Sequence, residues 1–309
     1  MIDVAVIGGG AAGLSAALYS ARAGKSVTVY EREALGGQIT KAPLVENYPG
    51  ISEISGIRLG ERMAAGAQNA GAEICFSEVQ SIEKEAGLFQ ICSDNGKQTA
   101  RTVIYACGAR PRPLDLPNEA ALVGRGISYC ALCDGTFFRG MDVAVVGGGN
   151  SALNDALLLS KICRNVALIH RRNTFRAEQI LIDRAKSRKN ITFLTDTVLT
   201  ELIEKGGQLD GLMLKSTDGK TQHLAISGLF AALGRLPNTD LIARRCTLDA
   251  NGYVQADVNT AVLQTPGLFA AGDCRSKSVR QLVTAAADGA TSAVYACKYL
   301  ETACGAPSK

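Results

Sequence analysis

Two cysteines two residues apart lie near the middle of the chain, in the stretch CALCD that runs from Cys130 to Asp134. A CxxC pair occurs in metal sites and in redox-active disulfides alike. A zinc site needs about four ligands, whereas the other eight of the ten cysteines are scattered singly and the histidines are His170 and His223. The sequence therefore predicts no metal site, and leaves a structural staple and a redox-active disulfide open.

Asp134 directly follows Cys133 and is the candidate for moving a proton in such a reaction. Thiol–disulfide exchange needs a thiolate as the attacking group, so one sulfur must lose a proton and the leaving sulfur must gain one. A carboxyl group in this role is favoured by a raised pKa. The alternative is that Asp134 caps the next turn. Single cysteines such as Cys107 and Cys274 are interpreted as small buried hydrophobes.

The composition describes an ordinary folded protein. The chain has 309 residues, which favours two domains, with 47% hydrophobic and 20% charged residues. The net charge of +4, from 33 basic and 29 acidic residues, argues against nucleic acid or an anionic membrane as the main partner. The apolar N-terminus has no basic region typical of a signal peptide, and no segment suits a membrane span. We therefore expect a cytoplasmic protein with mostly reduced thiols and any disulfide transient and catalytic.

A sequence repeat indicates the secondary-structure elements that must position these cysteines. Residues 3–14 read DVAVIGGGAAGL and residues 142–153 read DVAVVGGGNSAL, an offset of 139 residues. The same offset relates VTVYER (27–32) to VALIHR (166–171). Each copy predicts a strand, a glycine turn, a helix and a second strand, the unit that builds parallel sheets. The sequence therefore predicts an α/β fold with two Rossmann-like dinucleotide-binding domains.

The glycine spacing in each copy suits a dinucleotide. Gly8 permits the tight turn, Gly10 lets the backbone approach a pyrophosphate, and Gly13 lets the helix pack closely on the strand. The positive end of the helix then faces the phosphates. The second copy has Gly147, Gly149 and Ala152 at the corresponding positions.

The two copies differ where their second strands end, at Glu31 in the first and at His170 in the second. A carboxylate there accepts hydrogen bonds from ribose hydroxyls, which favours FAD or NAD. In the second copy, His170 is followed by Arg171 and Arg172, and Arg176 comes four residues after Arg172. Guanidinium groups match a 2′-phosphate, which favours NADP; the alternative is an ordinary basic loop.

The segments TVIYACGARPRP (102–113) and ISGLFAALGRLPN (226–238) each predict an apolar strand followed by a proline-containing linker. The segment from residue 267 to 300 predicts a strand, a polar loop after Gly272 and Asp273, and a long helix. We expect a first domain formed by 1–112 and 243–309, with a second domain, 113–242, inserted into it and carrying the CxxC pair.

These motifs together resemble the low-molecular-weight thioredoxin reductases, which are NADPH- and FAD-dependent flavoproteins. The resemblance covers nearly the whole chain and depends on GGGAAGLSAA, GGQITKAPLVENYPG, CALCDG, GGGNSA, HRRNTFRA, ALGRLPN and GLFAAGDCRSKSVRQLVTAA in family order. The larger disulfide reductases match less well, because their cysteine pair lies in the first domain and this chain has no cysteine before Cys75.

The resemblance implies residues for both cofactors. For FAD they are Gly8, Gly10, Gly13, Glu31, Gly37, Gln38, Asn47, Asp273, Arg280, Gln281 and Leu282. For NADPH they are Gly147, Gly149, Asn150, Ser151, Ala152, His170, Arg171, Arg172 and Arg176. The chain departs from the family at Asn150 and at the pair Asn154 and Asp155, where many relatives carry acidic residues.

The resemblance also implies the reaction. Hydride would pass from NADPH to the flavin, and electrons from there to a Cys130–Cys133 disulfide and on to thioredoxin or a thioredoxin-like protein. Cys133 would face the flavin, Cys130 would attack the partner, and the linkers would act as hinges in a homodimer. The alternatives are a flavin-dependent oxidase that makes disulfides with oxygen, which the arginines disfavour, and a flavin redox sensor or shuttle without turnover.

Overall fold

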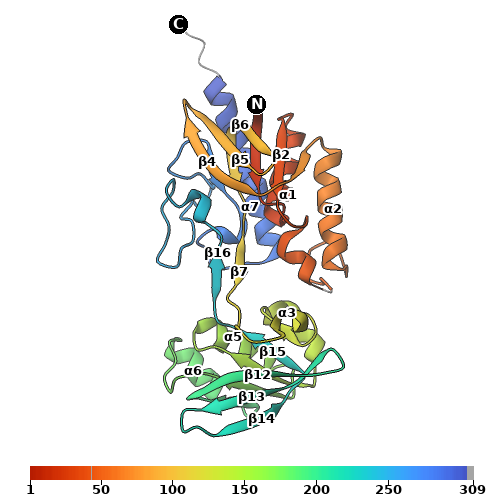
Figure 1. The fold of residues 1–309 in the computed structure, drawn as a ribbon, viewed down its shortest axis with the longest axis vertical. Helices are drawn as coiled ribbons and strands as arrows, with labels where there is room; N and C mark the ends of the chain where they lie inside the picture. The colour runs from red at the N-terminus through yellow and green to blue at the C-terminus, as the bar shows by residue number, and fades with distance from the viewer. Residues whose placement is uncertain (43, 305–309) are drawn as a thin grey trace. The chain divides into compact units, whose positions relative to one another are not determined.

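The computed structural model describes residues 1–42 and 44–304, and the chain divides into two compact units. The first unit is Met1–Arg110 with Leu236–Lys309, and the second is Pro111–Arg235 (Figure 1). The predicted α/β class, with one domain inserted into the other, is confirmed. Residues 236–242, which the sequence grouped with the inserted domain, fall in the first unit, and residues 111–112, which it grouped with the first domain, fall in the second. Residues 305–309 of the expected first domain lie outside the described residues.

The first unit is built on a parallel sheet that follows the predicted strand–turn–helix pattern. Its strands are β1 (Ile2–Ile7), β2 (Val27–Glu31), β3 (Glu73–Phe76), β6 (Gly96–Tyr105) and β17 (Leu268–Ala270). Their order is β3-β2-β1-β6, with β17 also paired to β6. The antiparallel strands β4 (Val79–Glu85) and β5 (Leu88–Ser93) continue the sheet from β6. The carboxyl ends of β1 and β2 therefore lie side by side, which brings the first glycine turn next to Glu31.

Two helices rich in small residues cover one face of this sheet. They are α1 (Ala11–Arg22) and α7 (Leu282–Cys304), while α2 (Gly56–Asn69) lies beside α1 (Figure 1). Val4, Val6 and Val29 of the sheet share a core with alanines of both helices. A Cβ atom at Gly289 of α7 would lie 2.0 Å from the carbonyl oxygen of Ala12. The small residues thus allow α7 to contact the first turn of α1.

The second unit is also built on a parallel sheet, which here has five strands. The strands are β8 (Ile127–Ser128), β9 (Asp142–Val146), β10 (Asn165–Ile169), β11 (Ile191–Leu194) and β15 (Gly228–Ala231), in the order β11-β10-β9-β15-β8. Helices α5 (Asn150–Leu159) and α6 (Gln179–Lys186) pack on one face. An antiparallel sheet of β12 (Thr197–Lys205), β13 (Gln208–Ser216) and β14 (Thr221–Ala225) covers the other.

Short elements complete the chain. The strands β7 (Ala109–Pro111) and β16 (Arg235–Pro237), which carry the chain across the two unit boundaries, pair with each other. The remaining helices are α3 (Glu119–Leu122), α4 (Ala131–Asp134) and the 3₁₀ turns η1 (Gly37–Lys41), η2 (Gly135–Phe138), η3 (Asp240–Ile242) and η4 (Gly272–Cys274). Within the described ranges, none of the helices is long and apolar enough to span a membrane.

Candidate active site

The first glycine turn has the close contacts that its spacing predicts. Gly8 has φ of +105°, and a Cβ atom there would lie 2.6 Å from the Ala106 carbonyl oxygen. A Cβ atom at Gly13 would lie 1.8 Å from the Gly8 carbonyl oxygen, so helix α1 could not approach the turn with any larger residue. Gly10 is the N-cap of α1, and no side chain of the described residues caps it. The first N–H groups of α1 are therefore available to a phosphate.

Glu31 lies at the end of β2 and its carboxylate faces this turn. The carboxylate accepts hydrogen bonds from the Gly9 N–H at 2.7 Å and from the Glu33 N–H at 2.8 Å. These bonds hold both oxygens at the edge of the glycine turn. A carboxylate has about four lone-pair sites, so it retains acceptor capacity for ribose hydroxyls.

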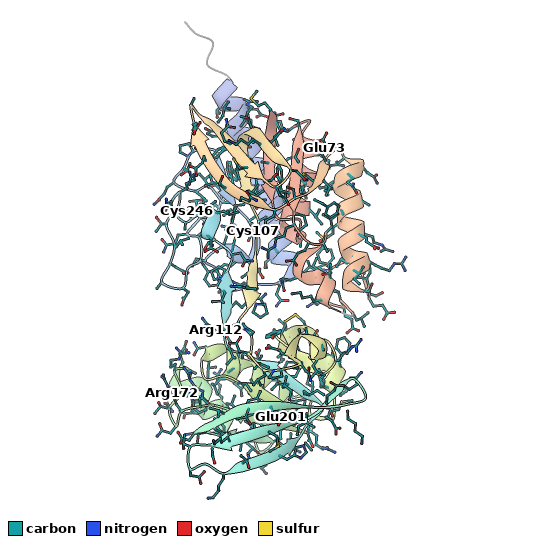
Figure 2. All side chains as sticks on the ribbon, viewed as in Figure 1. Glu73, Cys107, Arg112, Arg172, Glu201 and Cys246 are labelled. Carbon is teal, nitrogen blue, oxygen red and sulfur yellow. A yellow bond between two sulfur atoms is a disulfide. The ribbon has the colours of Figure 1, made fainter. Side chains whose placement is uncertain are left out.

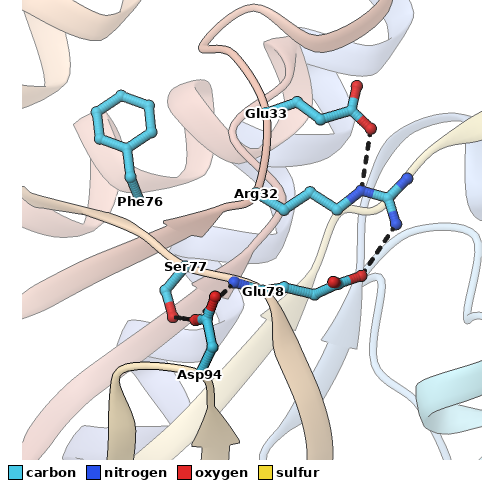
Figure 3. Close-up of a pocket in the computed structure, with 6 residues that line it drawn as sticks. All are labelled: Arg32, Glu33, Phe76, Ser77, Glu78 and Asp94. Carbon is cyan, nitrogen blue, oxygen red and sulfur yellow. Dashed lines mark hydrogen bonds and ion pairs between the residues drawn. The ribbon is translucent and has the colours of Figure 1, made fainter.

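A polar cavity of about 500 Å³ borders the same strand end (Figure 3). Arg32 crosses it, with Nε 3.2 Å from Glu33 Oε1 and Nη1 3.2 Å from Glu78 Oε1. The lining residues come from three separate segments: Arg32, Glu33, Phe76, Ser77, Glu78 and Asp94. The sequence analysis missed this cavity, because its walls are far apart along the chain.

Two further segments meet the start of α1. The Gly36 N–H donates to the Gly9 carbonyl at 2.8 Å, which places Gly37 and Gln38, at the start of η1, beside the glycine turn. A Cβ atom at Gly272 would lie 2.8 Å from the Ala12 Cβ, so Asp273 lies next to the first turn of α1. Leu282 packs on the cluster of Val45, Ile54 and Leu59 that also contains Ile39. Asn47 lies in the exposed loop between Val45 and Ile54.

Several residues that the sequence analysis missed hold the predicted flavin residues in place. Asp288 accepts hydrogen bonds from the Gly272 N–H at 3.0 Å and from Lys277 Nζ at 2.8 Å, and Lys277 lies 3.9 Å from Asp273. The Arg280 guanidinium stacks 3.9 Å from the ring centroid of Tyr253.

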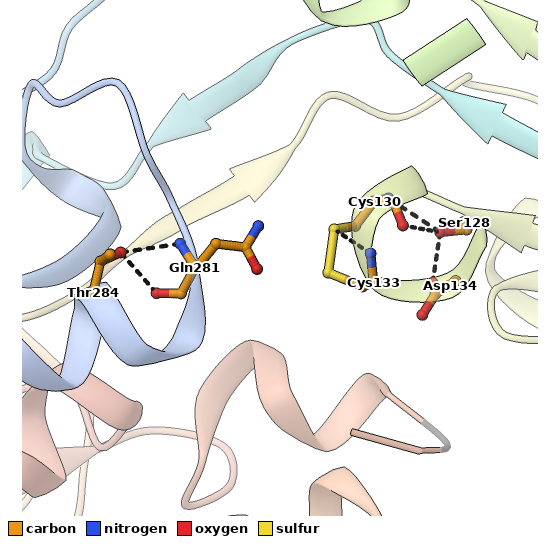
Figure 4. Close-up of a disulfide and its surroundings, with 6 residues drawn as sticks. All are labelled: Ser128, Cys130, Cys133, Asp134, Gln281 and Thr284. Atoms are coloured by element: carbon orange, nitrogen blue, oxygen red, sulfur yellow. Dashed lines mark hydrogen bonds between the residues drawn. A yellow bond between two sulfur atoms is a disulfide. The ribbon is translucent and has the colours of Figure 1, made fainter. Parts of the chain in front are cut away.

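Gln281 is held by the start of α7. Its N–H donates to the Thr284 hydroxyl at 3.1 Å, and that hydroxyl donates back to the Gln281 carbonyl at 2.9 Å (Figure 4). Thr284 therefore fixes the chain at the point where Gln281 and Leu282 enter the helix.

The second glycine turn is equally close-packed. A Cβ atom at Gly147 would lie 2.5 Å from the Ala232 carbonyl oxygen and 2.8 Å from the Ala152 Cβ, whereas one at Gly149 would meet no described atom within 4 Å. Gly149 is the N-cap of α5, and among the described side chains none caps it. Asn150 exchanges two hydrogen bonds of 2.8 Å with Glu178, while Ser151 is exposed in the first turn.

The basic segment after β10 folds around the His170 ring. The imidazole is buried, stacks on Phe175 with the ring centroids 4.9 Å apart, and has Nε2 3.1 Å from the Thr174 carbonyl oxygen. A Cβ atom at Gly148 would lie 2.1 Å from the ring, so His170 packs under the glycine turn. His170 therefore supports the loop from inside.

The three arginines surround that ring on the exposed side. Arg171, Arg172 and Arg176 are all exposed, and the Arg176 N–H donates to the Gly148 carbonyl at 2.8 Å (Arg172 is labelled in Figure 2). Burial lowers the pKa of His170, and the three guanidinium groups lower it further. The imidazole is therefore kept neutral inside a cluster of positive charge beside the second glycine turn.

Cys130 and Cys133 are joined by a disulfide, with their Cα atoms 5.3 Å apart, at the start of the short helix α4 (Figure 4). The Cys133 N–H donates to Cys130 Sγ at 3.2 Å, and the Cys130 carbonyl accepts the N–H groups of Cys133 and Asp134 at 3.1 and 3.0 Å. Cys130 is half-buried and Cys133 is exposed. The hydrogen bond from the Cys133 N–H would stabilise negative charge on the Cys130 sulfur.

Asp134 is positioned by Ser128, a residue that the sequence analysis did not select. The Ser128 hydroxyl donates to Asp134 Oδ2 at 2.6 Å (Figure 4). Burial raises the pKa of Asp134, and the hydrogen bond from Ser128 opposes this rise. A carboxyl group with a raised pKa, four positions after the first cysteine, suits the uptake and release of a proton. Ser128 could have been suspected from its place two positions before Cys130.

Cys107 and Cys274 are single thiols outside any disulfide. Burial raises the pKa of Cys107 and of Cys274 to about 12, so both remain protonated thiols. In the ranges 1–42 and 44–304, no three His, Cys, Asp or Glu side chains gather as a metal site would require.

Both glycine turns fit a dinucleotide on structural grounds. Each precedes a helix whose N-terminus no described side chain caps, and each has a glycine at the N-cap. A Cβ atom at Gly149 would meet no described atom within 4 Å, and one at Gly10 would meet only the backbone of Gly36 and Gly37, at 3.9 and 4.0 Å. A pyrophosphate requires this combination of free N–H groups and open backbone. The first turn has a carboxylate, which suits ribose hydroxyls. The second turn has a cluster of positive charge, which suits a phosphate.

Comparison with known proteins agrees with this geometry. The model of the pyridine nucleotide-disulphide oxidoreductase family matches residues 2–289. A thioredoxin reductase of Mycolicibacterium smegmatis is 40% identical over 300 residues, which cover 96% of each chain. A bifunctional thioredoxin reductase/thioredoxin of Mycobacterium leprae is 39% identical, covering 96% of this chain and 66% of that protein. The crystal structure of thioredoxin reductase from Streptococcus pyogenes superposes with a TM-score of 0.92 at 37% identity, covering 98% and 99% of the two chains.

The resemblance to thioredoxin reductases that the motifs predict is thereby confirmed, and membership of this family implies a flavin and a nicotinamide cofactor. The cysteine pair, its carboxyl neighbour and the two glycine turns lie in a chain that matches such enzymes over nearly its full length. The chain belongs to the pyridine nucleotide-disulphide oxidoreductase family.

Proposed function

We propose that this protein is an NADPH-dependent thioredoxin reductase. The observation that carries the proposal is the Cys130–Cys133 disulfide with Asp134 beside it, in a unit that also holds a dinucleotide turn with a positive cluster. A disulfide with a proton-carrying neighbour suits exchange with another protein's disulfide. The likeness to thioredoxin reductases over 96% of the chain supports the same function.

We assign FAD to the first unit and NADPH to the second. Glu31 supports the first assignment, because its oxygens lie at the edge of a turn whose helix is uncapped by any described side chain. Gly37, Gln38, Asp273 and Leu282 lie around the same helix start, which suits contacts to the rest of a long dinucleotide. Arg171, Arg172 and Arg176 support the second assignment, because three exposed guanidinium groups suit a 2′-phosphate.

When bound, the two cofactors supply the two-electron transfer that opens the disulfide. The chain's own residues then carry out the exchange. Cys130, as a thiolate stabilised by the Cys133 N–H, attacks a disulfide of the partner, and one sulfur of the partner leaves. Cys133 then attacks Cys130, releases the reduced partner and closes the Cys130–Cys133 disulfide. Asp134 takes up and returns the protons that the departing and attacking sulfurs need.

The proposed partner is thioredoxin or a thioredoxin-like protein. The bifunctional relative, which by its name joins both activities in one chain, supports this choice. A homodimer, hinge motion at the linkers and a cytoplasmic location stay predictions. The oxidase and the sensor or shuttle alternatives are not favoured, since the relatives are thioredoxin reductases.

An anaerobic titration of the purified protein tests the proposal. We expect NADPH to bleach the flavin absorbance rapidly, NADH to do so poorly, and added thioredoxin to be reduced catalytically. Cys130→Ser and Cys133→Ser should retain flavin bleaching and lose thioredoxin reduction. A colourless protein that takes up no flavin, or a flavin that dithiols reduce and NADPH does not, would contradict the proposed function.

A further inference from the structure

A buried carboxylate in the second unit contacts the residue directly before the cysteine pair. Glu119, at the start of α3, is only 8% exposed. It accepts hydrogen bonds from the Leu114 N–H at 2.8 Å, from the Asp115 N–H at 3.0 Å and from the Tyr129 hydroxyl. All three partners are donors, which is the set that an ionised carboxylate satisfies. Tyr129 is the residue immediately before Cys130.

Apolar contacts reinforce the same junction. Leu114, Leu116 and Tyr129 pack together on the core cluster that contains Leu122 and Ile127. The Tyr129 ring is therefore held by the core, while its hydroxyl is held by Glu119. Burial raises the pKa of the Tyr129 hydroxyl, and its hydrogen bond to Glu119 raises it further, so the hydroxyl remains a donor.

The backbone that leads into Cys130 is thus held from two sides. Ser128 bonds to Asp134, and its hydroxyl also accepts the Cys130 N–H at 3.0 Å. Tyr129, the residue between Ser128 and Cys130, is held by Glu119. The direction in which Cys130 presents its sulfur to Cys133 depends on this backbone. A fixed backbone keeps the two sulfurs close and so favours the closed disulfide.

We propose that Glu119 is a positioning residue for the redox pair: acting through Tyr129, it holds Cys130 where the Cys130–Cys133 disulfide closes readily. The inference depends on the proposed function only in treating this pair as redox-active. It assigns to Glu119 no contact with a substrate or cofactor. Loss of its hydrogen bond to Tyr129 loosens the Cys130 backbone, lowers the effective concentration of one thiol at the other, and makes the disulfide easier to reduce.

The test is the equilibrium of the full-length protein with a dithiol. The Cys130–Cys133 disulfide and dithiothreitol exchange two electrons and two protons, giving two protein thiols and the cyclic disulfide of the reagent. Alkylation and mass measurement of the Cys130 peptide report the reduced fraction. We expect the equilibrium constant for reduction to rise roughly three- to tenfold in Glu119→Gln, which loses one acceptor, and in Tyr129→Phe, which loses the donor.

Two comparisons make the result specific. Glu201→Gln changes an exposed glutamate on β12 of the same unit and should leave the equilibrium unchanged. The double variant should shift the equilibrium no further than the larger single change, because both remove one interaction. Unchanged equilibria in Tyr129→Phe, or two shifts that simply add, would overturn the proposal. Because the measurement uses neither NADPH nor thioredoxin, failure of turnover with a normal shift would count against the proposed function alone.

Discussion

The Ser128 hydroxyl links Asp134, the proposed proton carrier, to Cys130, the first cysteine of the disulfide. It donates to Asp134 Oδ2 at 2.6 Å and accepts the Cys130 N–H at 3.0 Å. One small side chain therefore orients both groups and also opposes the effect of burial on the carboxyl pKa. The proton chemistry of Asp134 can therefore be tested apart from its position. One substitution changes the carboxyl group itself, and another removes the hydrogen bond that orients it.

Asp134→Asn removes the carboxyl group that we propose as the proton carrier, while it keeps the shape of the side chain. We expect kcat for thioredoxin reduction to fall roughly 10²- to 10⁴-fold, the usual contribution of general acid–base catalysis. Flavin bleaching by NADPH should remain, since that step uses other residues. Stopped-flow absorbance of the flavin and steady-state turnover measure the two effects separately. Turnover at the normal rate would show that Asp134 carries no proton in the reaction; its side chain makes no capping hydrogen bond to the turn that follows it.

Ser128→Ala removes the hydrogen bond that lowers the pKa of Asp134. Because burial then acts unopposed, the pKa of Asp134 rises further and the carboxyl ionises at higher pH. We expect the corresponding inflection in the pH profile of kcat/KM to move upward, with a smaller loss of turnover than in Asp134→Asn. Ser187→Ala, at an exposed serine after α6, is the matched control. An inflection that stays in place would mean that another group controls the profile.

The features that the sequence predicted are those that short local patterns determine. The glycine turns, the strand ends at Glu31 and His170, and the order of the segments follow from spacing within about thirty residues. Side-chain contacts that no motif spacing encodes were missed, although they are close in sequence: the Asp288 bond to the Gly272 N–H and the Glu119 bond to Tyr129 join residues 16 and 10 positions apart in different elements. His170 was predicted as an NADPH contact from its place at the strand end and from the family resemblance, whereas its ring packs under the glycine turn.

The arginine cluster should select NADPH over NADH. Arg171→Ala and Arg176→Ala should each raise KM for NADPH roughly ten- to a hundredfold, the loss expected for a hydrogen bond between charged groups, and leave KM for NADH nearly unchanged. Arg184→Ala, an exposed arginine on α6, controls for general charge. Initial rates with both nucleotides provide the comparison. A parallel loss with NADPH and NADH would argue against recognition of a 2′-phosphate.

Two glycine-to-alanine changes should have opposite effects on the first unit. Gly13→Ala places a Cβ atom 1.8 Å from the Gly8 carbonyl oxygen, so α1 must move away from the turn. We expect a destabilised protein that is purified without flavin. Gly66→Ala, inside α2, meets no described atom within 4 Å and should stabilise the helix by about 1 kcal/mol. Flavin absorbance per protein and denaturant unfolding test both changes, and a yellow, stable Gly13→Ala would refute the close packing.

Asp155 should make the stability of the protein depend on pH. This partly buried carboxyl lies on α5, and burial raises its pKa from 3.8 to about 7. The folded state therefore holds the proton that the unfolded state releases, so stability is greatest below about pH 4 and is lost as pH rises towards 7.

Asp155→Asn is neutral at every pH and should unfold at a higher denaturant concentration than the wild type at about pH 8, with an upper bound near 4 kcal/mol on the gain in stability. The gain should shrink as pH falls towards about 4 and disappear well below 3.8, where Asp155 is protonated in both states. Asp210→Asn, at an exposed carboxyl on β13, should show no such trend. An equal gain at both pH values would point to better packing of the amide, because only the cost of ionising a buried carboxyl varies with pH.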